Sequence, residues 1–216
     1  MLSKLPTVWR ENRVFLIFIL FMFVFRSAFA DWNEVPSGSM KPTIIEGDRL
    51  LVNKMAYDLR VPFTHISLLK RADPKRGDIV IFDSRSAGKR LVKRVIGLPG
   101  DVVAMRHNRL RINGHALAYR EAVPGKPFAE AEENLLGLRH KIWFSPRASQ
   151  MSSFEAIRIP DGHYLVLGDS RDNSADSRII GMVPRDEIVG RAKSVVVSLN
   201  YENYYIPRRN RFFHTL

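Results

Sequence analysis

Residues 91–101 read Leu-Val-Lys-Arg-Val-Ile-Gly-Leu-Pro-Gly-Asp, an apolar run that carries two adjacent cations and ends in a Pro-Gly turn. Runs of this length and β-branched content are typical of strands. Alternate side chains of a strand share a face, so Lys93 lies with Leu91 and Val95, while Arg94 points the opposite way. This stretch therefore predicts a strand that places one cation on an apolar face.

Similar short runs recur through most of the chain after Asp31. Each is bounded by turn residues, and Asn113-Gly114 is a strong two-residue hairpin signal. No long helical periodicity separates the runs, so we expect an all-β, mostly antiparallel fold. From 105 to 160 the pattern loosens, which predicts a smaller inserted lobe. The expected strands are residues 49–54, 79–82, 91–96, 102–105, 110–112, 157–159, 164–167 and 194–197.

The N-terminus is typical of a membrane-targeting segment. Basic residues precede twelve unbroken apolar residues from Val14 to Phe25. Extended to Ala30, a helix would reach about 26 Å, if Arg26 snorkels to the far interface. The positive-inside rule then predicts a cytoplasmic N-terminus over 1–13, a single-pass anchor over 14–30 and an exported domain over 31–216.

Ala28-Phe29-Ala30 also fits the cleavage site of a removable signal peptide. Arg26, between the apolar run and the small residues, counts against cleavage. Cleavage after Ala30 would also leave Ser39, the second serine of the motif Ser37-Gly38-Ser39, only nine residues from a free end. We therefore expect an uncleaved anchor.

Composition narrows the possible chemistry. The 216 residues carry a formal charge of +12 and a pI near 10.3, which suits an anionic membrane surface or nucleic acid. No zinc-finger or basic-helix pattern supports nucleic acid. The chain has no cysteine, which excludes disulfides, thiol catalysis and thiolate metal sites. The six histidines form no metal-like i,i+4 pair.

A second stretch, Pro36-Ser37-Gly38-Ser39-Met40, supplies a candidate nucleophile. Apolar surroundings can lower a lysine pKa toward neutrality, and a neutral lysine can take the proton of a serine. Alone, the serine motif reads as an ordinary turn, and Lys93 as a solvent-facing lysine that protects an edge strand. The third stretch, 168–178, packs Asp, Arg and Ser between apolar runs and predicts a rigid hydrogen-bonded loop. Its spacing does not fit a calcium loop.

The three stretches, in this order, resemble the type I signal peptidases, also called leader peptidases, a family of Ser-Lys membrane serine proteases. The match also includes Lys41-Pro42-Thr43, Gly47-Asp48 and Arg76-Gly77-Asp78, and it covers most of the chain. Ser170 stands where the family usually has Asn. The resemblance implies that Ser39 is the nucleophile and Lys93 the general base. It further implies an oxyanion hole from the Ser39 N–H and the Ser37 hydroxyl, a supporting set of Ser174, Asp176 and Arg178, and substrate pockets lined by Val35, Pro36, Ile44 and Leu91.

The activity implied by the resemblance is hydrolysis of preproteins after a small-x-small sequence, which removes the signal peptide through an acyl-enzyme. The resemblance also implies that this reaction needs no metal and no organic cofactor. The implied place is the bacterial cytoplasmic (inner) membrane, with the catalytic domain on the outer, periplasmic face. The implied partners are preprotein signal peptides, membrane lipid and the protein export machinery. A specialised Ser-Lys pilin or conjugation-type processing peptidase is the alternative. The apolar segment 61–69 either contacts the membrane or packs as a buried strand pair.

Overall fold

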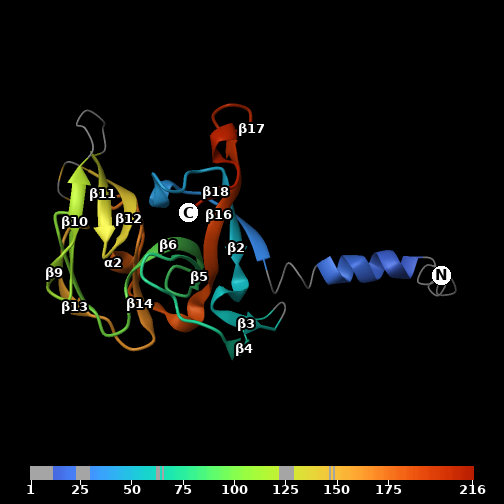
Figure 1. Ribbon diagram of the computed structural model, residues 1–216, viewed down its shortest axis with the longest axis horizontal. Coiled ribbons are helices and arrows are strands. Elements are labelled where there is room, and N and C mark those ends of the chain that lie inside the picture. Colours follow the sequence, from blue (N-terminus) through green and yellow to red (C-terminus); the bar gives the residue numbers. More distant parts are fainter. Residues whose placement is uncertain are drawn as a thin grey trace.

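The computed structural model of the protein describes residues 12–22, 30–61, 64, 66–121, 129–145, 147 and 149–216. As the sequence predicted, the fold is mostly antiparallel β-sheet (Figure 1). Residues 12–22 form a helix. No helix within the described ranges combines the length and apolar character needed to span a membrane. The rest of the predicted anchor, residues 23–29, lies outside the described residues.

The largest sheet of the described chain has nine strands, in the order β1-β2-β16-β5-β6-β14-β15, with β17 and β18 also paired to β16. The long strand β16 (Ile188–Asn200) joins the two halves, because it pairs with β2 on one side and β5 on the other. The other members are β1 (Ala30–Glu34), β2 (Asp48–Asn53), β5 (Ile79–Ser84), β6 (Lys89–Gly97), β14 (His163–Leu167), β15 (Val183–Pro184), β17 (Ile206–Pro207) and β18 (His214–Thr215).

The hairpin of β5 and β6 carries the predicted lysine strand. Lys93 lies opposite Val80 in the register, and Arg94 lies opposite Ile79. Apolar side chains cover both faces of this hairpin: Val80 and Val95 belong to one buried cluster, and Ile79 belongs to another. The two cations are therefore held inside the domain on opposite faces of one strand.

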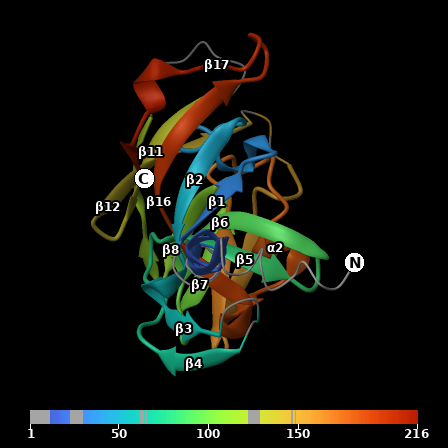
Figure 2. The same ribbon diagram turned by 90° about the vertical axis from the view of Figure 1, so that its right-hand side faces the viewer.

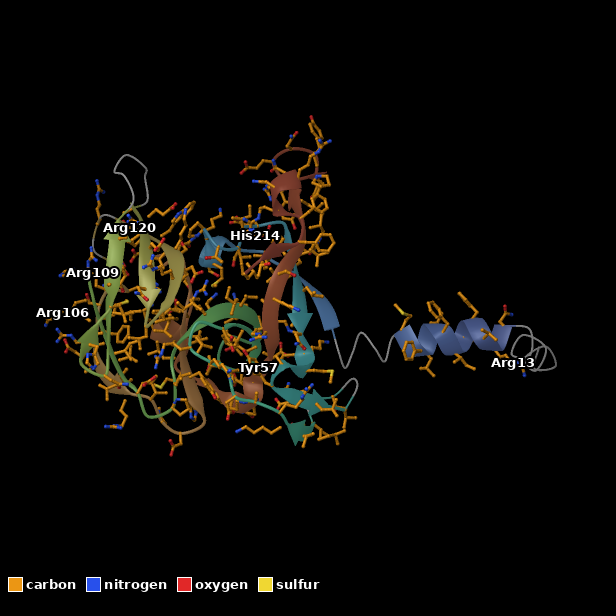
Figure 3. The ribbon with its side chains drawn as sticks, viewed as in Figure 1. Arg13, Tyr57, Arg106, Arg109, Arg120 and His214 are labelled. Atoms are coloured by element: carbon orange, nitrogen blue, oxygen red, sulfur yellow. The ribbon has the colours of Figure 1, made fainter. Side chains whose placement is uncertain are left out.

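Residues 102–158 form two smaller sheets beside the large one. One is β10-β11-β12 and the other β13-β7-β8-β9. The turn at Asn113-Gly114 connects β8 to β9, which confirms the predicted hairpin. Figure 3 shows Arg106, Arg109 and Arg120 on the outer side of this lobe, away from the large sheet. The bounds are β7 (Val102–Arg106), β8 (Arg109–Ile112), β9 (His115–Ala116), β10 (Ala118–Glu121), β11 (Ala129–Leu135), β12 (Leu138–Phe144) and β13 (Phe154–Arg158).

Part of the apolar segment 61–69 belongs to a separate hairpin, which is formed by β3 (Asp58–Arg60) and β4 (Ser67–Lys70). Ile66, Leu68 and Leu69 are 63%, 65% and 59% exposed, so the buried strand pair that we had left open is wrong for these three side chains. Phe63 lies outside the described residues. This hairpin and β17 lie at opposite ends of the domain in both views (Figures 1 and 2).

Gly47 lies in the turn before β2, where the backbone packs closely against β16. Its φ is +89°, and a Cβ there would lie 2.0 Å from the backbone oxygen of Leu199. Gly88, in the β5–β6 turn, also has a positive φ of +62°, but a Cβ there would meet nothing within 4 Å. Alanine at position 88 would therefore introduce backbone strain alone, whereas alanine at position 47 would add steric overlap to that strain.

We expect Gly47→Ala to lower the free energy of unfolding by about 3 kcal/mol or more, and Gly88→Ala by only about 1 kcal/mol. The difference arises because alanine at 47 adds a clash with rigid backbone to the strain of the left-handed conformation. Urea unfolding followed by circular dichroism measures both. Equal losses would show that the turn before β2 moves freely away from β16.

Candidate active site

Ser39 and Lys93 lie in direct contact, although 54 residues separate them in the sequence. Ser39 is in the short 3-10 turn Gly38–Met40, and Lys93 is near the middle of β6. Lys93 Nζ donates to Ser39 Oγ at 2.7 Å and to the carbonyl oxygen of Val92 at 2.9 Å. The arrangement places an amine where it can exchange a proton with the serine hydroxyl.

Burial makes this lysine unusual. The residue is only 3% exposed, and the loss of water lowers the pKa of Lys93 to about 8, against the opposing effect of the Asp176 and Asp169 carboxylates. A lysine with such a pKa has an appreciable neutral fraction at mildly alkaline pH. The expectation that an apolar face lowers this pKa is therefore supported by the surroundings of the side chain.

Arg94, on the other face of β6, is held by a buried carboxylate. Its Nε and Nη2 donate to the two oxygens of Asp169 at 2.8 and 2.7 Å, and Nη1 donates to the carbonyl oxygen of Gly77 at 3.0 Å. Asp169 also accepts from Thr43 Oγ1 at 2.6 Å. Burial alone would raise the pKa of Asp169, but Arg94 beside it holds that pKa below its ordinary value.

The loop 168–178 contacts the serine turn directly. The backbone N–H of Ser170 donates to the carbonyl oxygen of Ser39 at 3.1 Å. A Cβ on Gly168 would lie 2.4 Å from that same oxygen, so only glycine fits there without movement. Asp169 thus ties the residues after Ser39 to the strand that carries Lys93, because it bonds both Thr43 and Arg94.

The expected pair of Asp176 and Arg178 is present. Arg178 Nη2 and Nε donate to the two carboxylate oxygens at 2.7 and 2.8 Å. Asp176 also caps the short helix α2 (Ser177–Ile180) and accepts from the Gly168 N–H at 2.9 Å. Asp176 therefore connects helix α2 to Gly168 at the start of the loop 168–178.

Ser174 differs from expectation. Its hydroxyl is buried and has no hydrogen-bond partner among the described residues, so the expected hydrogen bond to Lys93 is not formed. The side chain packs next to Gly168, where a Cβ would lie 2.3 Å from Ser174 Oγ. The amine of Lys93 has its own two acceptors, Ser39 and the Val92 carbonyl, in place of this contact.

A cavity of about 440 Å³ opens beside the two contacting side chains; we call it the Ser39 cavity. Its walls include all four residues expected to form substrate pockets. Ser37 also lines it and donates from Oγ to Ser39 Oγ at 3.4 Å. Sequence reasoning missed six further lining residues. The full lining is Asn33, Glu34, Val35, Pro36, Ser37, Ser39, Met40, Ile44, Lys89, Arg90, Leu91, Val92 and Lys93.

A larger cavity, of about 700 Å³, lies on the Arg94 face of β6 and is lined by Thr43 and Arg94 but by neither Ser39 nor Lys93. The contacting hydroxyl and amine line only the smaller of these two cavities, which makes the Ser39 cavity the candidate site. Within the described part of the chain, no group of three or more His, Asp or Glu side chains is arranged to hold a metal ion.

Comparison with known proteins agrees with this geometry. The family model described as signal peptidase, peptidase S26, matches residues 8–197. Signal peptidase I of Pseudomonas fluorescens is 36% identical over 219 residues, which cover 91% of this chain and 75% of that protein. Signal peptidase I T of Bacillus subtilis is 34% identical over 199 residues, which cover 92% of this chain and 90% of that protein.

Among solved structures, a signal peptidase I from Enterococcus faecalis matches 56% of this chain and 97% of its own, at 30% identity and a TM-score of 0.38. The sequence matches are the decisive ones, because the family model alone spans most of the chain, including both residues of the buried Ser–Lys contact. This chain belongs to the signal peptidase family, peptidase S26.

Proposed function

We propose that the contact between Ser39 and Lys93 is the catalytic centre of this chain, a serine endopeptidase that removes N-terminal signal peptides from preproteins. The observation that carries the proposal is the 2.7 Å contact between a serine hydroxyl and a buried lysine whose pKa is lowered to about 8 by burial. The relatives are named as signal peptidase I, which does not favour the alternative of a pilin or conjugation-type peptidase.

In the first half of the reaction, neutral Lys93 Nζ accepts the proton of Ser39 Oγ while the oxygen attacks the scissile carbonyl carbon. The tetrahedral intermediate collapses to an acyl-enzyme ester on Ser39, and the leaving amine takes the proton from Lys93. In the second half, Lys93 accepts a proton from the water that attacks the ester carbonyl carbon. The second tetrahedral intermediate then collapses, Lys93 returns the proton to the departing Ser39 Oγ, and the signal peptide leaves with a free carboxylate. No metal or organic cofactor takes part in these steps.

The developing oxyanion needs preorganised donors. We assign them to the backbone N–H of Ser39 and the hydroxyl of Ser37, which lines the Ser39 cavity beside the nucleophile. Bound substrate would draw the Ser37 hydroxyl away from its long contact with Ser39 Oγ. Ser174, Asp176 and Arg178 are assigned a supporting role, in which the last two hold the loop next to Ser39.

Substrate selection is assigned to the apolar part of the Ser39 cavity. Val35, Pro36, Ile44 and Leu91 leave room for small side chains, which suits cleavage after a small-x-small sequence. Two of these residues, Val35 and Ile44, are fully packed into the core and cannot easily move aside. A large side chain would therefore clash with the walls.

We further propose the domain division read from the sequence: 1–13 in the cytoplasm, 14–30 as a single-pass anchor in the bacterial cytoplasmic membrane, and 31–216 on its periplasmic face, with 105–160 as the smaller lobe. The support is the run of apolar residues from Val14 to Phe25 flanked by basic residues. The export machinery is a proposed partner, because the substrates arrive from it.

The domain itself is proposed to rest on lipid through two exposed apolar patches. The hairpin patch is Ile66, Leu68 and Leu69, and the tip patch is Tyr204, Tyr205, Ile206 and Phe213. β4, which carries Leu68 and Leu69, and β17, which carries Ile206, both lie away from the small lobe in Figure 1. Arginines in the same C-terminal stretch suit anionic headgroups.

The first test concerns the two catalytic assignments. We expect Ser39→Ala, Lys93→Ala and Lys93→Arg each to lower kcat on the order of 10⁴-fold, because nucleophile and base act as one unit and a guanidinium does not deprotonate. Preprotein cleavage by the detergent-solubilised chain measures this, with circular dichroism as the control for folding. An active Lys93→Arg enzyme would overturn the base assignment.

The second test concerns pH. Lys93 must be neutral to act, so protonation below its pKa removes activity, and kcat/KM should rise with pH along a limb with an apparent pKa near 8. A limb near the ordinary histidine range, around 6.5, would indicate a different base. His140 does not fit that limb either, since burial and then Arg94 lower the pKa of His140 to about 4.

The third test concerns the hairpin patch. Because the chain has no cysteine, Leu68→Cys can carry a single environment-sensitive fluorophore in the full-length protein. In anionic liposomes we expect a blue-shifted emission that brominated lipid quenches. The matched control is Arg109→Cys, on the outer side of the lobe (Figure 3), whose label should stay unquenched. Equal quenching at both positions would contradict lipid contact through the hairpin.

A further inference from the structure

The Ser39 cavity extends past the apolar pockets to a polar end. Its walls there are Asn33 and Glu34 at the end of β1 and Lys89 and Arg90 at the start of β6. Lys89 is four residues before Lys93 on the same strand, and at ~3.3 Å per residue the separation along the strand is about 13 Å. A peptide of extended conformation that reaches Ser39 can therefore also reach Lys89.

The charges at this end do not cancel. Arg90 is neutralised by Asp83, which accepts from its Nε and Nη2 at 2.7 and 2.9 Å. Glu34 is neutralised by Arg49 at 2.6 Å. Lys89 is exposed and has no ion-pair partner in the described part of the chain. One uncompensated positive charge thus lies at the end of the Ser39 cavity.

Arg90 also connects the two walls of this polar end. Its Nη1 donates to Asn33 Oδ1 at 3.4 Å, a contact that connects β6 to β1 across the cavity. Both strands are members of the large sheet, but they are not neighbours in it. A peptide passing this contact leaves the cavity next to Lys89.

The direction of the peptide follows from the order of the walls. Leu91 lies between Lys89 and Lys93 along β6, and Val35, directly after β1, lies between Glu34 and Ser39 in the sequence. Both are assigned to the small-residue pockets. A substrate whose last small residues fill these pockets directs its preceding residues toward Lys89. This step rests on the proposed function, and one extended residue per ~3.3 Å places the fourth or fifth residue before the scissile bond near the charge.

We propose that Lys89 is a specificity residue that reads the charge of the signal peptide four to five residues before the cleavage site. An acidic side chain there is attracted and a basic one repelled. Because Lys89 is exposed, the effect is modest: an aspartate substrate should exceed its lysine counterpart about three- to tenfold in kcat/KM. Added salt should reduce the ratio, since exposed charges are screened.

The experiment uses the full-length chain in detergent and preproteins that differ only in having Asp, Ser or Lys at the fourth or the fifth residue before the bond. Lys89→Glu should invert the Asp-to-Lys preference. Burial is the main cause of the low Lys93 pKa and Lys89 contributes to it, so the variant alters the rate for every substrate. The ratio between two substrates at one pH removes this contribution.

The matched control is Lys193→Glu, an exposed lysine of β16 that lines the other cavity and gives the same change in net charge. It should leave the Asp-to-Lys ratio as in the unmodified chain. The proposal is overturned if Lys89→Glu keeps the original ratio, or if Lys193→Glu shifts it equally. Failure of the unmodified chain to cleave the Ser preprotein would instead refute the proposed function, which separates the two outcomes.

Discussion

The removal of Lys93 from water beside Ser39 is the constraint on which the rest of the structure depends. Bringing its pKa from 10.5 to about 8 has an energetic cost on the order of 3 kcal/mol, which packing elsewhere must offset. The strand β6 is suited to this, because both of its faces are covered by apolar clusters of the large sheet. The buried position of Lys93 is thus a consequence of core formation.

The alternation of β6 separates two cations with opposite requirements. Lys93 needs neighbours that do not hold its amine in the protonated form. Its two hydrogen-bond acceptors are uncharged: the hydroxyl of Ser39 and the carbonyl oxygen of Val92. Arg94 carries a planar guanidinium that matches a carboxylate with two parallel donors, and both oxygens of Asp169 accept from it. Since Asp169 also bonds Thr43, the ion pair on one face sets the position of the serine turn on the other.

Much of this was accessible from the sequence, because the informative patterns were local. The β-branched runs predicted the strands, Asn113-Gly114 predicted its hairpin, and Lys93 next to Arg94 predicted two faces. The pairing of Arg94 with Asp169 was not predictable in the same way, since partners 75 residues apart meet only through sheet order. The hydrogen bond expected between Ser174 and Lys93 rested on the family resemblance and not on a local pattern. The Ser174 hydroxyl has no hydrogen-bond partner among the described residues.

The strand β12 reaches from the small lobe into the active site. The backbone N–H of Trp143 donates to the carbonyl oxygen of Asp169 at 2.9 Å, and the N–H of Arg171 donates to that of Trp143 at 2.7 Å. Ser170, between these two bonds, holds the carbonyl of Ser39. The lobe therefore supplies backbone contacts to the loop that holds Ser39, and a shortened chain without β12 would lose them.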